Sequence, residues 1–326
     1  MVELSVARES WPIRGAFTIS RGSRTTAEVV VVGLSDGTHT GRGECVPYPR
    51  YDETVDGVIQ EIEGLRDALA QGLDRHALQD RLPAGAARNA LDCAFWDLEA
   101  KQAGKRVWEL AGLSEPQPVP TAYTLSLDTP ARMAVSAKDN AERPLLKLKL
   151  SGPDDLDRVA AVRSNAPDAR LIVDANEGWT ADQYRNLAEE LRDLGVDMIE
   201  QPLPAADDEG LAGIVRPVPV CADESCHDRA SLDALAGKYD MVNIKLDKTG
   251  GLTEALALKA EAEAAGFAVM VGCMLATSLA MAPAVLLGQE VEIVDLDGPL
   301  LLAKDRDGGL TFEGSFIHPP SAGLWG

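Results

Sequence analysis

Positive charge is scarce in this chain of 326 residues. Lysine and arginine together number 31, whereas aspartate and glutamate number 52, and the formal net charge is −21. A polyanion of this kind is repelled by nucleic-acid phosphates and by anionic lipid surfaces. We therefore exclude nucleic acids and membranes as partners.

Cysteine is also sparse, and its pattern argues against a disulfide framework. The five cysteines form no Cys-x-x-Cys pair and are odd in number, and the four histidines share no common spacing. An apolar signal segment is absent from the first twelve residues, where Glu3, Arg8 and Glu9 lie. We therefore expect a protein of a reducing compartment, the cytoplasm.

Long uncharged runs are nearly absent too. Only residues 266–289 lack charged side chains over a length that can span a bilayer. Gly272, Thr277, Ser278 and Pro283 interrupt this run, and a buried strand followed by a buried helix has the same composition. We predict that strand and helix rather than a membrane span.

The first third of the chain has the pattern of a β-meander followed by helices. Residues 3–44 contain short apolar runs separated by turn residues. Between two of these strands, the polar residues 20–24 are expected to form an exposed, mobile tip. Apolar residues then recur at helical spacing from Ala87 to Leu98, with Gly104 as the expected end of that helix. The proline-rich residues 114–120 are typical of a linker.

Beyond the linker, strands and helices alternate. Eight short apolar runs, the first at residues 119–125, are each separated from the next by a segment of helical period. This alternation predicts a parallel sheet, and eight strands favour a closed β/α barrel. The expected later strands are 145–150, 171–174, 196–200, 218–223, 241–245, 267–272 and 291–295.

Three acidic residues end successive predicted strands. Asp174, Glu200 and Asp223 would converge at the mouth of a barrel, where active sites lie. Three such carboxylates repel one another unless a cation lies among them, and ligation by oxygen alone suits Mg²⁺. Each acid taken singly is more often a helix cap. Their common position favours the metal site.

Three lysines are expected at the same mouth. Lys147 and Lys149 alternate with leucines, so both share one strand face, and that face is the barrel interior if the leucines meet the helices. Burial and mutual repulsion would lower their pKa toward that of a usable base. The alternative, an edge strand with solvated lysines, conflicts with the strands predicted on both sides. Lys245 would approach from the opposite side, and two opposed bases suit a racemisation.

Several motifs together resemble the enolase superfamily, in its muconate-lactonising subgroup. The resemblance extends over essentially the whole chain, and Asp295-Leu-Asp297-Gly and the tip are similar to the dipeptide epimerases of that subgroup. The motifs are Lys147-Leu-Lys149, Asp174-Ala-Asn176, Glu200-Gln-Pro202, Asp223-Glu-Ser225, Lys245-Leu-Asp-Lys-Thr-Gly-Gly251 and the segment from Pro83 to Asp97.

The resemblance implies both a fold and a set of residue roles. It implies an N-terminal α+β capping domain (1–115), a modified (β/α)7β TIM-like barrel (116–300) and a C-terminal tail that returns to the cap (301–326). It also implies that Mg²⁺, held by the three carboxylates, binds the substrate carboxylate. Lys149 would be the base on the L face and Lys245 the base on the D face, and Lys147 would help to neutralise an enediolate.

The activity implied is Mg²⁺-dependent epimerisation of L-Ala-D-Glu to L-Ala-L-Glu, in murein peptide metabolism and peptidoglycan recycling. Asp295 and Asp297 suit the substrate ammonium, although a second metal or a turn would also explain them. Arg24 is the candidate reader of the glutamate side chain, with Arg21 as its rival.

Two alternative functions stay open at this point. Another reaction of the subgroup is one: N-acylamino-acid racemisation, o-succinylbenzoate synthesis or cycloisomerisation. A catalytically silent scaffold is the second, and the opposed lysines argue against it. The sequence also leaves open whether the chain forms a homo-oligomer.

Overall fold

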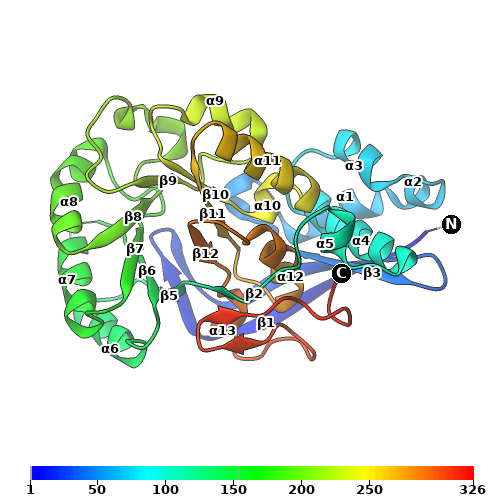
Figure 1. Ribbon diagram of the computed structural model, residues 1–326, viewed down its shortest axis with the longest axis horizontal. Coiled ribbons are helices and arrows are strands. Elements are labelled where there is room, and N and C mark those ends of the chain that lie inside the picture. The colour runs from blue at the N-terminus through cyan, green and yellow to red at the C-terminus, as the bar shows by residue number, and fades with distance from the viewer. Residues whose placement is uncertain (1, 153) are drawn as a thin grey trace.

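A three-stranded antiparallel sheet forms the N-terminal part of the computed structural model, which describes residues 2–152 and 154–326 (Figure 1). Its strands lie in the order β1 (Glu3–Ile19), β2 (Gly22–Ser35) and β3 (Thr40–Cys45). Strands β1 and β2 form a long hairpin that reaches from the sheet to the barrel. Residues 20–24, called the tip from here on, comprise the turn at Ser20 and Arg21 and the first three residues of β2. The predicted β-meander is therefore confirmed.

Helices follow this sheet and complete the cap. They are the 3-10 turn η1 (Pro49–Tyr51), α1 (Val55–Glu63), α2 (Arg66–Ala70), α3 (Arg75–Arg81) and α4 (Ala86–Ala103). Helix α4 ends as predicted at Gly104, which has a φ of 63°. It is buried on almost every side, because it lies between the sheet and the barrel segments α10 (Leu246–Thr249) and α11 (Leu252–Ala264).

Strand β3 and helix α4 approach each other so closely that two positions require glycine. A Cβ atom at Gly43 would lie 2.0 Å from the carbonyl oxygen of Ala90, and one at Gly41 would lie 2.1 Å from that of Ala94. Both neighbours are helix backbone, which moves only if the whole helix moves. The two glycines therefore place α4 directly on the sheet.

Eight parallel strands form the barrel, in the unbroken order β5 to β12 around its wall. The main chain of Ala122 donates a hydrogen bond to the Val294 oxygen at 2.8 Å, which joins the first strand to the last. The strands are β5 (Tyr123–Leu125), β6 (Leu145–Lys149), β7 (Arg170–Asp174), β8 (Val196–Glu200), β9 (Val220–Ala222), β10 (Met241–Ile244), β11 (Ala268–Gly272) and β12 (Ile293–Asp295).

An apolar layer fills the barrel below its mouth. One buried residue from each strand or its first neighbour contributes to it: Ala122, Leu145, Ile172, Met198, Cys221, Met241, Met270 and Ile293. Such a layer is typical of a closed barrel, whose interior is packed rather than open. The predicted fold class, an α/β barrel with an α+β cap, is confirmed.

Helices surround the barrel wall, with one exception to the expected alternation. The connection from β8 to β9 holds only the 3-10 turns η2 (Ala205–Asp207) and η3 (Glu209–Leu211) in place of an α-helix. The other connections hold α6 (Pro130–Asp139), α7 (Asp155–Asn165), α8 (Ala181–Asp193), η4 (Arg229–Ser231) with α9 (Leu232–Leu235), α10 with α11, and α12 (Ser278–Leu287); α13 (Gly298–Leu301) follows β12.

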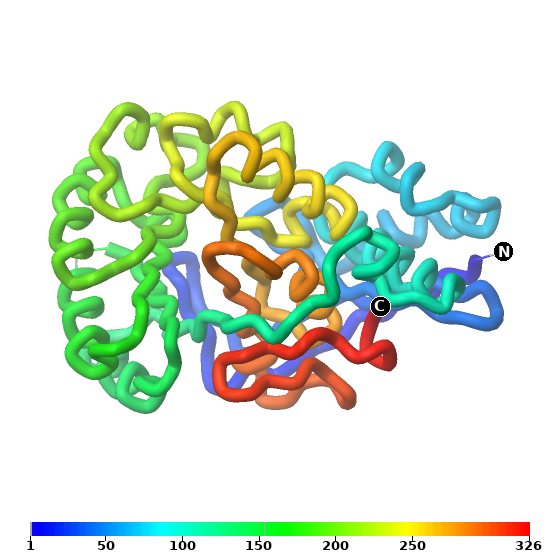
Figure 2. Tube along the Cα trace, in the orientation of Figure 1, coloured from blue at the N-terminus to red at the C-terminus, as the bar shows by residue number. Residues whose placement is uncertain are grey.

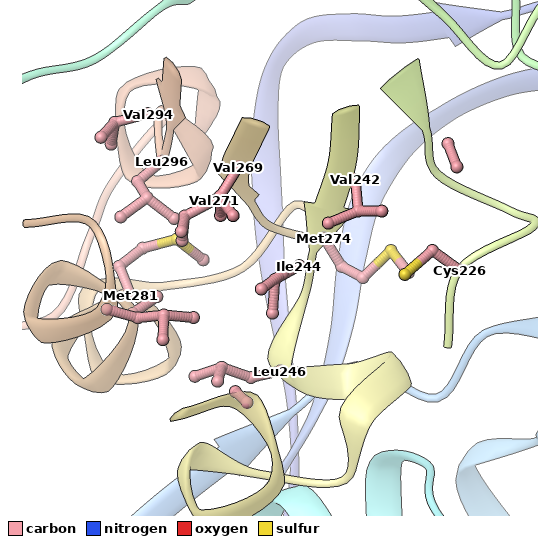
Figure 3. Close-up of a cluster of buried hydrophobic side chains, with 14 of the residues drawn as sticks. Cys226, Val242, Ile244, Leu246, Val269, Val271, Met274, Met281, Val294 and Leu296 are labelled. Carbon is pink, nitrogen blue, oxygen red and sulfur yellow. The ribbon is translucent and has the colours of Figure 1, made fainter. Parts of the chain in front are cut away.

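Side chains of β10 and β11 alternate between the barrel interior and the outer face, which packs against the surrounding helices. Val242 and Ile244 of β10 and Val269 and Val271 of β11 point into the apolar layer between strands and helices (Figure 3). The charge-free residues 266–289 form β11 and α12, both buried, as predicted. Among the described residues, no helix combines the length and the apolar composition that a bilayer crossing needs.

The C-terminal segment lies beside the linker and contacts the cap (Figure 2). Strand β14 (Phe316–Ile317) pairs with β13 (Phe312–Glu313) and with β4 (Val119–Pro120) of the linker, which follows the short helix α5 (Val107–Leu110). The indole of Trp325 is fully buried and donates to the Cys93 oxygen of α4 at 3.0 Å. This segment therefore holds the cap and the barrel together.

Candidate active site

Six charged side chains meet at the C-terminal ends of the barrel strands, and all are buried. They are Lys147 and Lys149 on β6, Asp174 on β7, Glu200 on β8, Asp223 after β9 and Lys245 after β10. The strand register places Lys149 beside Asp174 and Asp174 beside Glu200. The structure therefore brings the predicted lysines and carboxylates to one place.

The alternation on β6 decides which way its lysines face. Leu146, Leu148 and Leu150 are fully buried in the layer between strands and helices. Because neighbouring residues of a strand point to opposite faces, Lys147 and Lys149 face the barrel interior. The alternative of solvated lysines on an edge strand is wrong, since β6 pairs with β5 on one side and β7 on the other.

Asp174, Glu200 and Asp223 form a triad whose composition fits a divalent metal ion. One carboxylate oxygen from each residue lies within 4.8 Å of the others. Oε2 of Glu200 is buried and lies 2.5 Å from Lys147 Nζ. Three carboxylates at this spacing are oxygen ligands of the kind that Mg²⁺ prefers. The sequence-based proposal of this triad as the metal site thus agrees with its chemistry.

Each lysine is held by a carboxylate. Lys149 Nζ lies 2.6 Å from Oδ2 of Asp174, and Lys245 Nζ lies 2.6 Å from Oδ2 of Asp223. Strands β6 and β10 are four positions apart in the eight-stranded order, so the two lysines approach from opposite sides of the mouth. The two ammonium groups therefore face each other across the triad.

Lys147 lies deeper, among three carboxylates. Its Nζ is 2.5 Å from Glu200, 2.7 Å from Asp295 and 3.4 Å from Asp174. Burial acts to lower the pKa of Lys147, but these negative charges outweigh it and raise the pKa well above its usual value. The same balance, with Asp223 as the main charge, raises the pKa of Lys245. The expectation of a lowered pKa at Lys147 is wrong, because it considered the lysine pair without the surrounding acids.

The pKa values of Asp174 and Glu200 shift in opposite directions. Burial acts to raise the pKa of Asp174, but Lys149 and Lys147 outweigh it and lower the pKa to about 2. At Glu200, burial and the negative charge of Asp174 together raise the pKa. At Glu200, burial and neighbouring negative charge thus outweigh the nearby lysine, as expected where a cation would bind.

A small cavity of about 50 Å³ lies between the lysines and the cap. Lys149 and Lys245 line it from the barrel, and Phe17, Arg21 and Arg24 line it from the hairpin. Its remaining lining residues are Ile19, Tyr48, Tyr51, Asn176, Asp223, Glu224, Cys273, Met274 and Leu275. A larger cavity of about 400 Å³, lined by hairpin and η1 residues that include Phe17 and Arg24, lies next to it. The site is therefore built jointly by barrel and cap.

The two arginines of the tip lie in different environments. Arg21 pairs with Glu224 at 2.8 Å and donates to the Asn176 oxygen at 3.0 Å. Arg24 makes no ion pair among the residues that the structure describes, and its guanidinium lies 5.7 Å from the ring centre of Tyr48. The tip is exposed at Arg21 as expected, but it is bonded to the barrel rather than surrounded by solvent.

Asp295 and Asp297 are not among the residues that line this cavity. Asp295 pairs with Lys147, and its Oδ1 is buried with no hydrogen-bond partner among the described residues. Asp297 accepts from the Thr124 amide at 2.6 Å. Burial, with the charge of Asp295 adding, raises the pKa of Asp297 to about 7. Lys147 thus compensates Asp295, whereas Asp297 makes no ion pair among the described residues.

Two neighbours of the triad escaped the sequence reasoning. Asn243 donates to Oε1 of Glu200 at 2.7 Å from inside β10, and Glu224 lines the cavity directly after Asp223. A polar residue at an inward position of a buried strand was the available signal for Asn243. The adjacent acid in Asp223-Glu224 was the available signal for the second residue.

Comparison with known proteins assigns the family. Residues 1–112 match the mandelate racemase/muconate lactonizing enzyme N-terminal domain, and residues 131–324 match the enolase C-terminal domain-like family. The chain belongs to the mandelate racemase/muconate lactonizing enzyme family. Within the enolase superfamily, this agrees with the subgroup that the motifs resemble.

Close relatives of this family member are epimerases and racemases. An L-Ala-D/L-Glu epimerase of Escherichia coli (strain K12) is 50% identical over 98% of this chain and all of that protein. An N-acetyl-D-glutamate racemase of a Pseudoalteromonas species is 45% identical over 91% of this chain and 95% of that protein.

Solved structures agree with these relatives. An enolase family member from Agrobacterium tumefaciens with homology to dipeptide epimerases contains bound sodium and L-Ala-L-Glu. It is 54% identical, covers both chains completely and has a TM-score of 0.98. Three similar dipeptide epimerase structures, 25% to 29% identical, are complexed with Mg and a dipeptide.

Proposed function

We propose that this protein catalyses the Mg²⁺-dependent epimerisation of L-Ala-D-Glu to L-Ala-L-Glu by a two-base proton transfer. The observation that carries the proposal is the placement of Lys149 and Lys245 on opposite sides of one cavity, which lies next to the triad and is also lined by Arg24. A carbon held between two lysines can lose a proton to one and receive a proton from the other on its opposite face.

The metal site supports this chemistry. We assign Asp174, Glu200 and Asp223 as the residues that hold Mg²⁺. When bound, the ion supplies Lewis-acid stabilisation of the negative charge on the substrate carboxylate. Its positive charge would also offset the negative charge of the triad. Without the ion, that negative charge contributes to raising the pKa of Lys245 and Lys147. Lys147, already in contact with Glu200, would add its charge beside the same carboxylate.

The ends of the dipeptide would be read by groups of opposite charge. Arg24 lines the cavity without an ionic partner among the described residues, which suits the glutamate carboxylate. Asp295 and Asp297 would bind the terminal ammonium, since Oδ1 of Asp295 has no hydrogen-bond partner and Asp297 no ion pair among the described residues. Lys149 on the L face and Lys245 on the D face are assigned by family resemblance.

A second candidate reaction is racemisation of N-acetyl-glutamate, which the 45% identical relative favours. Both substrates present a glutamate to Arg24, but only the dipeptide presents an ammonium to the Asp pair. The presence of Asp295 and Asp297 therefore favours the dipeptide, because an acetyl group brings no positive charge to the buried carboxylate of Asp297.

One experiment separates these candidates and tests the metal. L-Ala-D-Glu and N-acetyl-D-Glu are each incubated with the enzyme in D₂O, and α-proton exchange is followed by ¹H NMR. We expect rapid exchange of the dipeptide, slow exchange of the acetylated compound, no exchange after chelation and recovery with Mg²⁺. Faster exchange of N-acetyl-D-Glu would replace the proposed substrate, and full turnover in chelated enzyme would refute the metal assignment.

The biological setting follows from the substrate. Because D-glutamate is a component of murein peptides, we propose a role in peptidoglycan recycling, in the cytoplasm.

We also propose that the capping domain ends at residue 115 and that the barrel domain ends at residue 300.

A further inference from the structure

Arg21 bonds to both the cap and the barrel at one point. Its guanidinium lies 2.8 Å from Glu224, 3.0 Å from the Asn176 oxygen and 3.3 Å from both Glu177 and the Tyr48 hydroxyl. The side chains of Glu224 and Glu177 are 1% and 10% exposed and that of Arg21 is 28% exposed, so these pairs are shielded from water mainly on the carboxylate side. Shielded, multiply bonded pairs hold their geometry far better than exposed ones.

The barrel partners of Arg21 directly follow metal-site residues. Glu224 is the next residue after Asp223, and Asn176 lies two residues after Asp174. The main-chain N–H of Asn176 donates a hydrogen bond to Oδ1 of Asp174 at 2.8 Å. Asn176 and Glu177 have φ angles of 45° and 65°, an uncommon conformation for residues other than glycine. In this turn, the main-chain oxygen of Asn176 accepts hydrogen bonds from Arg21 and from the Ser20 hydroxyl, both at 3.0 Å.

The contact needs the shape of arginine as well as its charge. A guanidinium offers five donors in a planar fork, whereas a lysine ammonium offers three from one atom. Four acceptors on four different residues surround Arg21, and one atom cannot reach them all. Glu177 also forms an ion pair with Arg50 of η1 at 2.7 Å, so the same barrel loop is bonded to a second part of the cap.

We propose that Arg21 is a positioning residue that fixes the tip to the two loops behind the triad, and that it thereby holds Arg24 and Phe17 over the lysines. Phe17 pairs with Arg24 in the hairpin register, and its ring centre lies 5.9 Å from Lys149 Nζ. Arg21 and Arg24 thus divide two tasks: the first orders the tip and the second reads the substrate. Only the second task rests on the proposed function.

Hydrogen exchange of the backbone amides of residues 17–24 tests the first task without a substrate. In Arg21→Met, we expect these amides to exchange about tenfold faster or more, because the shielded pairs are lost. Arg8→Met is the matched control: it removes an arginine from the same hairpin, where Arg8 pairs with Glu28 at 2.8 Å in a more exposed position. Arg24→Met should also leave the exchange unchanged. Equal exchange in Arg21→Met and Arg8→Met would overturn the proposal.

Kinetics with two dipeptides tests whether Arg21 also reads the substrate. In Arg21→Met, kcat/KM should fall by one common factor for L-Ala-D-Glu and for a dipeptide with a neutral C-terminal side chain. Arg21→Lys should recover only part of the loss, because it restores charge but not the fork. A loss confined to L-Ala-D-Glu, with tip exchange unchanged, would show that Arg21 is the reader instead. If the wild type epimerises no dipeptide, the proposed function fails and the exchange result still decides the positioning role.

Discussion

Lys149 and Lys245 each bond a different carboxylate of the triad, and this separation allows each base to be removed singly. In Lys149→Ala and Lys245→Ala, we expect epimerisation to fall by roughly 10² to 10⁴, the usual contribution of a general acid or base. Each variant should still exchange the α-proton slowly on the face of its remaining lysine. Proton exchange of the separate L,L and L,D dipeptides in D₂O measures this, and an unimpaired variant would show that the named base is wrong.

Arg24 has no ionic partner to lose, so its replacement should affect substrate preference more than structure. In Arg24→Met, we expect the preference for L-Ala-D-Glu over a neutral dipeptide to fall by roughly 10- to 100-fold, the value of one charged hydrogen-bonded contact. Competition kinetics with the two dipeptides measures the ratio. An unchanged ratio would remove Arg24 from the recognition of the glutamate side chain.

The sequence predicts single residues well where a strand pattern fixes their direction. Lys147 and Lys149 could be placed in the interior because leucines alternate with them. The sequence could not predict the ionisation of Lys147, since that depends on Asp295, which is 148 residues away and only 2.7 Å distant. It also could not decide between Arg21 and Arg24, because their partners come from distant loops.

Strand β3 and helix α4 form the tightest contact between elements of the cap. We expect Gly43→Ala to destabilise the protein by about 1 to 3 kcal/mol or more, because the new methyl group would meet helix backbone rather than a side chain that can move. Urea unfolding measures the loss. Gly323→Ala is the control, since its Cβ would meet no atom closer than 3.8 Å, and equal stability of the two variants would contradict this view of the contact.

Most elements follow from periodicity, and the one exception has a physical reason. Helix α8 shows a clear apolar stripe with Tyr184, Ala188 and Leu191 buried, so its pattern predicts it. The connection from β8 to β9, residues 201–219, is similar in length to the others but contains Pro202, Pro204, Pro217 and Pro219. Proline lacks an amide donor and disfavours a helical residue before it, which suits 3-10 turns better than an α-helix.

At the scale of the whole molecule, Asp247 joins the barrel to the cap. Its Oδ1 accepts from the Val46 amide and the Asn89 side chain, both at 2.9 Å. Burial raises the pKa of Asp247 from 3.8 to about 7. Between these values the folded protein keeps a proton that the unfolded chain releases, so this group makes the free energy of unfolding fall as pH rises from about 4 to about 7.

Asp247→Asn should remove that pH dependence, because the amide keeps an acceptor oxygen but does not titrate. Relative to the wild type, the variant should gain stability as pH rises from 5 to 7. Urea unfolding at both pH values measures the difference. A constant difference between variant and wild type would show that Asp247 does not titrate in this range.

The overall architecture was predictable because eight strand runs recur with a regular spacing. The cavity that barrel and cap residues line together was not predictable. Sequence patterns report which elements exist and which faces are buried. They do not report where the long hairpin of the cap docks, since that depends on contacts such as Arg21 with Glu224, which lie 203 residues apart.

That separation also has a consequence for the order in which the protein assembles on the ribosome. At a translation rate of about 5 to 20 residues per second, roughly 10 to 40 seconds pass between the synthesis of Arg21 and that of Glu224. Throughout this interval the docking surface of the hairpin end is incomplete, because Glu224 is missing from it. Residues 17–24 must therefore acquire their final conformation late, after the barrel wall exists, and a nascent chain stalled before Glu224 should be cut there readily by trypsin.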